Sequence, residues 1–263
     1  MTEKIEIKIE LSDISNKCLL KIKETTECVS RIYQAIDKLE IDIHKPLPSD
    51  ELPILIDDNN PIPSVKKQKE ATINWALKKG FEDFIGGLTL SFKETYKFLK
   101  IYSLSNEPKY TKTRQEIESE LDKINIEIEK FHIPNFIQNI EKLLGKPLPL
   151  REEIESINKI RNCLVHRHGI VSGKDVKYSD DESLRLKWIS IQSYTIINGE
   201  KHIITYEMRK KGITLYNLSH EFISNEKVFK VGEKISLNIN EFNGVAATCS
   251  QFANSLFPLM PRP

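Results

Sequence analysis

Apolar residues recur at helical spacing through most of the chain before Gly173. Between Ile14 and Leu39 they are separated by three, four or seven positions, which places them in one stripe along a helix of about seven turns. The same spacing returns at Val65 and continues past residue 104. Further helices are predicted over residues 117–131, 136–144 and 149–166. The pattern therefore predicts a bundle of amphipathic helices.

Proline and glycine interrupt this pattern at two places. The segment "HKPLPSDELPILIDDNNPIP" (44–63) has five prolines in twenty residues, so neither a helix nor a central strand can run through it. Because it also contains several apolar residues, we expect an ordered connector rather than a free linker. Gly86 and Gly87 lie inside the second predicted helix, where each weakens a helix by about 1 kcal/mol relative to alanine. We expect them to mark a close helix crossing.

After Gly173 the periodicity changes from helical to alternating. The stretch "KWISIQSYTIINGEKHIITYEMR" (187–209) has two β-branched and aromatic runs on either side of Asn198-Gly199, which is typical of a hairpin. "GITLYNL" (212–218) and "KVFKVGEKISLNI" (227–239) are predicted to be further strands, and helical spacing resumes over 241–257. The expected fold is mainly α, with a small antiparallel β unit inserted before the C-terminal helix. We divide it into a helical domain (1–178), a β-rich unit (179–240) and a C-terminal helix that returns to the bundle (241–263).

Composition and charge exclude several classes of protein. The 39 basic and 38 acidic side chains give a net charge of +1, so an anionic partner must be met by a local patch. The runs "VKKQK" (65–69) and "RKK" (209–211) are candidates for phosphate contacts, although a solvated face is the simpler interpretation. The four cysteines are scattered without a C-x-x-C pair, and no apolar run reaches the length of a membrane span. We expect a cytoplasmic protein without a membrane segment.

The candidate chemistry lies in "INKIRNCLVHRHGIVSGKD" (157–175), at the end of a predicted helix. His166 and His168 are the only close histidine pair and have no carboxylate cluster beside them, so neither a metal site nor a cofactor is expected. No phosphate-binding glycine loop is present, and no base is positioned for a serine or cysteine nucleophile. A simpler interpretation remains: cations favour the last turn of a helix, and Gly169 is suited to end it.

Three residues of this stretch favour a functional interpretation. Arg161 and Asn162 stand in mid-helix, where a helix needs neither, and Asn162 shares a face with His166 four positions later. The sequence "IRNCLVHRHGIV" resembles the signature of the HEPN superfamily. Ribonucleases of this superfamily carry an arginine, often a polar residue next to it, and then a histidine after four to six positions. The helix "GFEDFIGGLTLSFKETYKFLK" resembles the supporting helices of these proteins. His168 also fits the spacing window, so either histidine could be the catalytic one.

The resemblance implies a metal-independent endoribonuclease that cleaves single-stranded RNA by attack of its own 2′-hydroxyl. Arg161, Asn162 and His166 are then the catalytic residues, and Arg167 and His168 make flanking RNA contacts. On an ideal helix Arg161 and His166 lie about 140° apart around the axis, so one copy supplies only part of a site. We therefore expect a homodimer in which two copies of the motif line one groove.

The resemblance also implies a biological setting. HEPN ribonucleases are common in bacterial anti-phage defence and toxin–antitoxin systems, so an antitoxin or a defence-system partner protein is expected. The β-rich unit, with Trp188, Tyr194 and Tyr206 near its hairpin, would sense a trigger or bind that partner. The alternative is a non-catalytic HEPN-like module that binds RNA or scaffolds other proteins.

Overall fold

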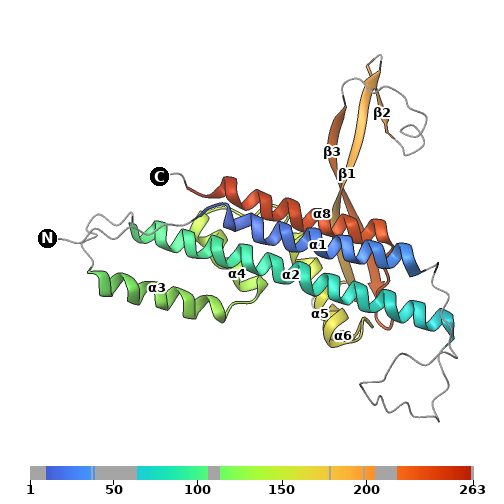
Figure 1. The fold of residues 1–263 in the computed structure, drawn as a ribbon, viewed down its shortest axis with the longest axis horizontal. Helices are drawn as coiled ribbons and strands as arrows, with labels where there is room; N and C mark the ends of the chain where they lie inside the picture. Colours follow the sequence, from blue (N-terminus) through green and yellow to red (C-terminus); the bar gives the residue numbers. More distant parts are fainter. Residues whose placement is uncertain are drawn as a thin grey trace, which may run out of the picture.

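A computed structural model gives the fold of the chain. It describes residues 10–36, 38, 64–105, 113–177, 179–197, 199–204 and 218–261. The helices are α1 (Asp13–Ile36), α2 (Val65–Ser105), α3 (Arg114–Glu129), α4 (Ile133–Leu144), α5 (Arg151–His166), α6 (Gly173–Val176), α8 (Ile239–Leu256) and the 3-10 helix η1 (Phe257–Leu259). The strands are β1 (Ser183–Ile197), β2 (Glu200–Ile203) and β3 (Ser219–Lys230). The predicted mainly helical fold with a small antiparallel sheet before the C-terminal helix is confirmed (Figure 1).

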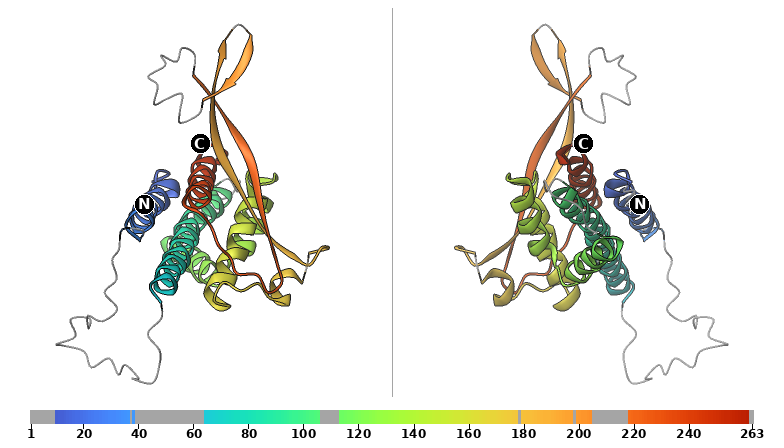
Figure 2. Two further views of the ribbon diagram at one scale, coloured as in Figure 1. Left: turned by 90° about the vertical axis from the view of Figure 1, so that its right-hand side faces the viewer. Right: turned by 90° about the vertical axis from the view of Figure 1, so that its left-hand side faces the viewer.

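The long helices α1, α2 and α8 pack alongside one another. Helices α4 and α5 lie on the side of α2 and α8 that faces away from α1 (Figures 1 and 2). The predicted stripe of α1 is buried, including Ile14, Cys18 and Ile22. A Cβ on Gly87 would lie 3.3 Å from Cys18 Sγ, so the glycine lets α2 approach the α1 backbone. The predicted close helix contact is therefore confirmed at Gly87, whereas a Cβ on Gly86 would meet only the Lys21 side chain.

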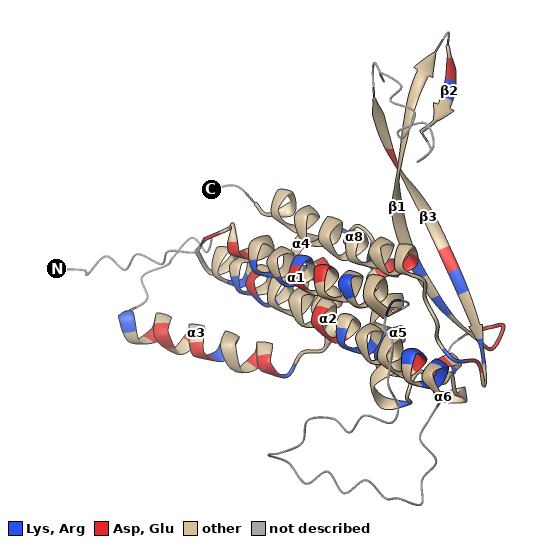
Figure 3. Cartoon of the chain, turned by 45° about the vertical axis from the view of Figure 1, so that its right-hand side comes forward, with Lys and Arg blue, Asp and Glu red and all other residues tan. Residues whose placement is uncertain are grey.

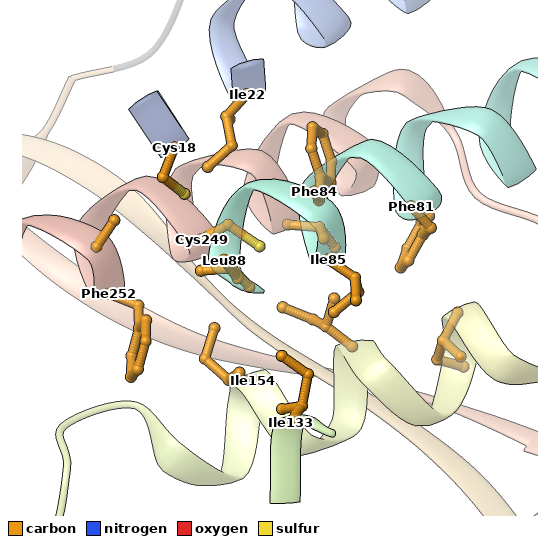
Figure 4. Packing of buried hydrophobic residues seen from close by; sticks show 14 of the residues in the cluster. Cys18, Ile22, Phe81, Phe84, Ile85, Leu88, Ile133, Ile154, Cys249 and Phe252 are labelled. Atoms are coloured by element: carbon orange, nitrogen blue, oxygen red, sulfur yellow. The ribbon is translucent and has the colours of Figure 1, made fainter. Parts of the chain in front are cut away.

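One hydrophobic core joins the helices to the base of the sheet. Figure 4 shows Cys18 of α1, Phe84 of α2 and Cys249 of α8 pointing into this core. Phe84 stacks on Phe242 of α8 with ring centroids 5.0 Å apart, a favourable aromatic separation. Leu184 and other residues of β1 belong to the same cluster, so the change from helices to strands near residue 179 does not separate two cores.

The sheet is a ribbon in the order β2-β1-β3, with both neighbouring pairs antiparallel. The predicted hairpin forms between β1 and β2, and Gly199 adopts the positive φ (85°) that its tight turn requires. The strand predicted over 227–239 is wrong in its position, because β3 begins at Ser219 and ends at Lys230. A turn with Gly232 at φ 87° follows, so the chain leaves the sheet there.

The ribbon is anchored at its base and projects from the bundle at its tip (Figures 1 and 2). At the base Trp188 is only 8% exposed, so it cannot serve as the exposed sensing residue that the sequence suggested. Tyr194, further along β1, is half-buried with Lys201 Nζ 4.5 Å from its ring centroid. Between these two positions, Ile191 and Phe222 are a cross-strand pair with both side chains more than half exposed.

Several predicted features lie outside the described residues: the connector 44–63, the basic run 209–211, Tyr206, Leu39 and all but the last residue of the strand 212–218. In the part of the chain that the structure describes, no helix combines the length and apolar character needed to cross a membrane. The basic run 65–69 forms the first turn of α2, where Val65, Lys66 and Lys67 are exposed.

Gly244→Ala is expected to destabilise the protein by about 1–3 kcal/mol through overpacking. A Cβ at this position of α8 would lie 2.6 Å from Nε1 of the buried Trp188 indole, which has little room to move. The loss exceeds the gain of about 1 kcal/mol that alanine brings in helix propensity. Chemical denaturation of the variant measures the difference directly.

The matched control is Gly173→Ala, because a Cβ there meets no heavy atom within 4 Å. That variant should unfold like the wild type. A smaller loss for Gly244→Ala in a Trp188→Leu background would identify the indole as the cause. An unchanged stability of Gly244→Ala would contradict this packing of β1 on α8.

Candidate active site

The candidate residues lie in the last turns of α5 and just beyond it. The helix begins at Arg151, two residues later than predicted, after Leu150 in a left-handed conformation (φ 53°). Glu152 and Glu153 occupy its first turn, where acidic side chains interact favourably with the helix dipole. Its buried face includes Ile154, Ile157 and Ile160, so the opposite face carries the polar residues outward.

The C-terminus of α5 is fixed by backbone hydrogen bonds. The amides of Arg167 and Gly169 both donate to the Cys163 carbonyl, at 3.0 and 3.1 Å. His168 and Gly169 both have positive φ, 54° and 74°, so the left-handed ending predicted for Gly169 begins one residue earlier. The Ile235 amide donates to the Gly169 carbonyl at 2.7 Å, which ties this turn to the segment after β3. His168 therefore does not continue the helical face of His166.

Arg161 and Asn162 are held together half-buried on α5. Arg161 Nη1 donates a hydrogen bond to Asn162 Oδ1 at 3.1 Å. Arg161 Nε is buried and has no hydrogen-bond acceptor among the described residues, and no carboxylate of that part of the chain lies within ion-pair distance of the guanidinium. Burial of a cation is costly unless it is paired. The guanidinium is thus suited to an anion that the chain itself does not provide.

His166 is the last residue of α5 and is exposed to solvent. It lies four positions after Asn162, so the two side chains share one face of the helix, as predicted. Lys159 and Glu155 precede them on the same face at helical spacing. Arg161 is thus hydrogen-bonded to Asn162, and Asn162 shares a helix face with His166, whereas His168 lies beyond the helix with a positive φ.

Arg167 is held in a pair that the sequence reasoning missed. Its Nε donates to Asp175 Oδ2 at 2.8 Å and its Nη2 pairs with Oδ1, while the Asp175 side chain is only 2% exposed. Asp175 also accepts from the Ser172 amide and hydroxyl, each at 2.9 Å. The spacing Ser172-x-x-Asp175 is a capping-box pattern and could have signalled the contact of Asp175 with Ser172, but not its pair with Arg167. Arg167 therefore has a structural partner, and its RNA contact stays a prediction.

A hollow of about 690 Å³ borders this region between α5, α6 and the start of β1. Asn162 and Arg167 line it, whereas Arg161, His166 and His168 do not. Figure 3 shows acidic and basic segments side by side where α5, α6 and the bases of β1 and β3 meet. Sequence reasoning missed this hollow because its walls come from segments up to 35 residues apart, such as Glu152 and Lys187.

Neither a metal cluster nor an activated thiol accompanies the motif among the described residues. No group of three or more His, Cys, Asp or Glu side chains that could hold a metal occurs among the described residues. All four cysteines are free thiols. Burial raises the pKa of Cys163, which lies inside the motif, to about 11. Because only the thiolate is a good nucleophile, Cys163 is unsuited to covalent catalysis at neutral pH.

Thiol reactivity should follow this burial. Burial also raises the pKa of Cys18 to about 11 and that of Cys249 well above the usual value. At pH 8 a thiol with a pKa of 11 is thiolate in only about 0.1% of molecules, and the raised pKa keeps it protonated until far above that pH. We expect Ellman's reagent to modify one thiol per native chain, the exposed Cys28, and four after unfolding. Rapid native reaction of a second thiol, persisting in Cys28→Ser, would contradict this packing.

The chain matches no model of a known protein family, no curated protein and no solved structure. The function is therefore inferred from the residues of this chain, above all from Arg161, which is hydrogen-bonded to Asn162 beside the face that carries His166.

Proposed function

We propose that the protein is a metal-independent endoribonuclease of the HEPN type that cleaves single-stranded RNA in the cytoplasm. Its active site is composite and lies at a homodimer interface, where Arg161, Asn162 and His166 of both protomers face one cleft. No metal ion or cofactor takes part. The proposal rests on the resemblance of the motif to HEPN ribonucleases and on the environment of the Arg161 guanidinium.

The observation that carries the proposal is the unpaired guanidinium of Arg161. It is half-buried, and its Nε lacks an acceptor among the described residues. Its side-chain hydrogen-bond partner there is the neutral amide of Asn162. A guanidinium presents parallel N–H groups that match the oxygens of a phosphate. An RNA phosphodiester would satisfy the group and neutralise its charge.

The proposed reaction divides the work among the three side chains. The 2′-oxygen attacks the adjacent phosphorus, the bond from phosphorus to the 5′-oxygen breaks, and a 2′,3′-cyclic phosphate and a 5′-hydroxyl are formed. His166 has the ordinary chemistry to transfer a proton near neutral pH. Arg161 stabilises the charge that develops on the phosphorane oxygens. Asn162 positions Arg161 through its Oδ1, and its amide nitrogen remains available as a donor.

The need for two protomers follows from the helix geometry. Arg161 and His166 are five positions apart on α5, about 140° around its axis, so they do not converge on one atom. A second copy related by a two-fold axis supplies a second arginine and histidine to the same groove. One imidazole then acts as base for the 2′-hydroxyl while the other protonates the leaving 5′-oxygen.

The proposed setting is a bacterial anti-phage defence or toxin–antitoxin system. The projecting ribbon would contact the trigger or an antitoxin, because the exposed pair of Ile191 and Phe222 gives it an apolar surface. Trp188 takes no part, since it is buried at the base of the ribbon.

The test is incubation of the protein with a single-stranded RNA in EDTA. Cleavage to fragments that end in 2′,3′-cyclic phosphate is the expected result, and the same sequence with 2′-O-methyl groups should remain intact. An RNA that is left whole by a protein shown to be dimeric would contradict the proposal.

The second candidate is a non-catalytic module that binds RNA or scaffolds other proteins. The exposed apolar ribbon favours it, because such surfaces commonly mark sites of protein interaction. Under this alternative the protein leaves RNA uncut, while an Ile191→Ser/Phe222→Ser variant loses partner binding and keeps its thermal stability.

A further inference from the structure

The hollow beside α5 has the size and polarity of a site for a charged ligand. Its volume of about 690 Å³ lies within the range of about 300–1,000 Å³ typical of ligand pockets. Leu184 is the only aliphatic residue among the described residues that line it, and the other lining residues are all polar or charged. Asn162 lies on its wall and accepts a hydrogen bond from Arg161, so the hollow adjoins the proposed site.

Two of the basic side chains that line the hollow have no ion pair within the part of the chain that the structure describes. Four of its five carboxylates have a basic partner within ion-pair distance. The pairs are Glu152 with Lys187, Glu155 with Arg151, Asp175 with Arg167, and Asp181 with Arg185. Within the described chain, Lys159 and Lys174 have no acidic partner, and Asp180 is the one lining carboxylate without a basic partner. Five acidic and five basic side chains line the hollow, so its lining has no net charge, but the ammonium groups of Lys159 and Lys174 are left without an ion pair among the described residues.

We propose that this hollow binds the RNA strand next to the cleaved linkage, with Lys159 and Lys174 contacting its phosphates. The inference rests on the proposed function and extends it from the cleaved linkage to the neighbouring nucleotides. Lysine is a common phosphate ligand that acts as a mobile point charge. Both lysines are exposed, so they can follow a flexible strand.

The positions of Lys159 and Lys174 define a path for the RNA strand through the hollow. Lys159 precedes Asn162 by three residues on the face of α5 that lines the hollow, a rise of about 4.5 Å. This rise, together with the reach of a lysine side chain, is comparable with the separation of consecutive phosphates along a single strand. Lys174 stands on α6 at another wall of the hollow, so the strand would pass between the two lysines.

The experiment measures binding of a 2′-O-methyl RNA single strand, which cannot be cleaved, over a series of salt concentrations. For Lys159→Ala/Lys174→Ala we expect the slope of log K against log salt to fall in magnitude by about 1.4, because each phosphate contact on a single strand contributes about 0.7. The affinity deficit of the variant then grows roughly 25-fold between 1 M and 0.1 M salt.

The matched control is Lys23→Ala/Lys130→Ala, which removes two exposed lysines distant from the hollow that have no ion pair among the described residues. It should retain the wild-type slope. A wild-type slope for Lys159→Ala/Lys174→Ala, an equal loss in the control, or no binding of RNA by the wild type would overturn the inference.

Binding and cleavage are separated by the choice of RNA. If the wild type binds the 2′-O-methyl strand with the expected lysine dependence but leaves unmodified RNA whole, the proposed nuclease function fails and the hollow stands as an RNA site. If unmodified RNA is cleaved and the lysine variant binds as tightly as the wild type at every salt concentration, the nuclease function stands and this inference fails.

Discussion

His166→Ala is expected to lower the rate of RNA cleavage about 10²–10⁴-fold, the usual contribution of a general acid or base. His166 ends α5 with its side chain exposed on the face that also carries Asn162. A symmetric site would lose both proton-transfer groups at once, because each protomer carries the substitution. Single-turnover cleavage of a labelled RNA measures the loss without interference from product release.

His168→Ala is the matched control and decides between the two histidines of the motif. His168 lies beyond the helix with a positive φ of 54°, so we expect its removal to change the rate by less than about tenfold. Thermal unfolding of both variants should match that of the wild type, since both side chains are exposed. Full cleavage by His166→Ala together with inactivity of His168→Ala would reverse the assignment.

Arg167→Ala should destabilise the protein by about 3–5 kcal/mol, because it leaves the Asp175 carboxylate buried without its cation. The pair is well shielded, with exposed side-chain fractions of 26% and 2% for Arg167 and Asp175. For a chain of this size, the loss corresponds to a fall in Tm of roughly 6–20 °C. Thermal unfolding monitored by circular dichroism gives the shift.

Lys174→Ala serves as the control, because it removes a neighbouring exposed cation that has no acidic partner in the described chain. Its Tm should equal that of the wild type. If Arg167→Ala unfolds like the wild type but binds RNA more weakly, Arg167 is a phosphate contact with little structural role. That result would support the sequence-based prediction for this residue over the structural one.

The helices could be predicted from the sequence because each buries one continuous stripe. Ile14, Cys18 and Ile22 show the spacing plainly, and the hairpin was predictable because Asn198-Gly199 separates two apolar runs. The strand β3 was misplaced because its residues from Ser219 alternate between half-buried and exposed positions without a strong apolar pattern. Its register depends on pairing with β1, which local spacing does not encode.

The candidate site was predictable only in part. The motif predicts Arg161, Asn162 and His166 as site residues, and the shared helix face of Asn162 and His166 follows from their spacing on α5. The role of Arg167 could not be predicted in the same way, because Asp175 reaches it only after the chain turns through Gly169. The hollow depends on tertiary packing of β1 against α5, so its free lysines are visible only in the folded chain.

The most direct test is the distance between the two copies of position 166 in the assembled protein. A spin label on His166→Cys in a Cys28→Ser background, where the remaining thiols are buried, can be measured by pulsed electron paramagnetic resonance. Two imidazoles that both reach one phosphodiester require a single short separation, no more than roughly 20 Å between labels. A monomeric protein, or labels on opposite sides of a dimer, would contradict the composite active site.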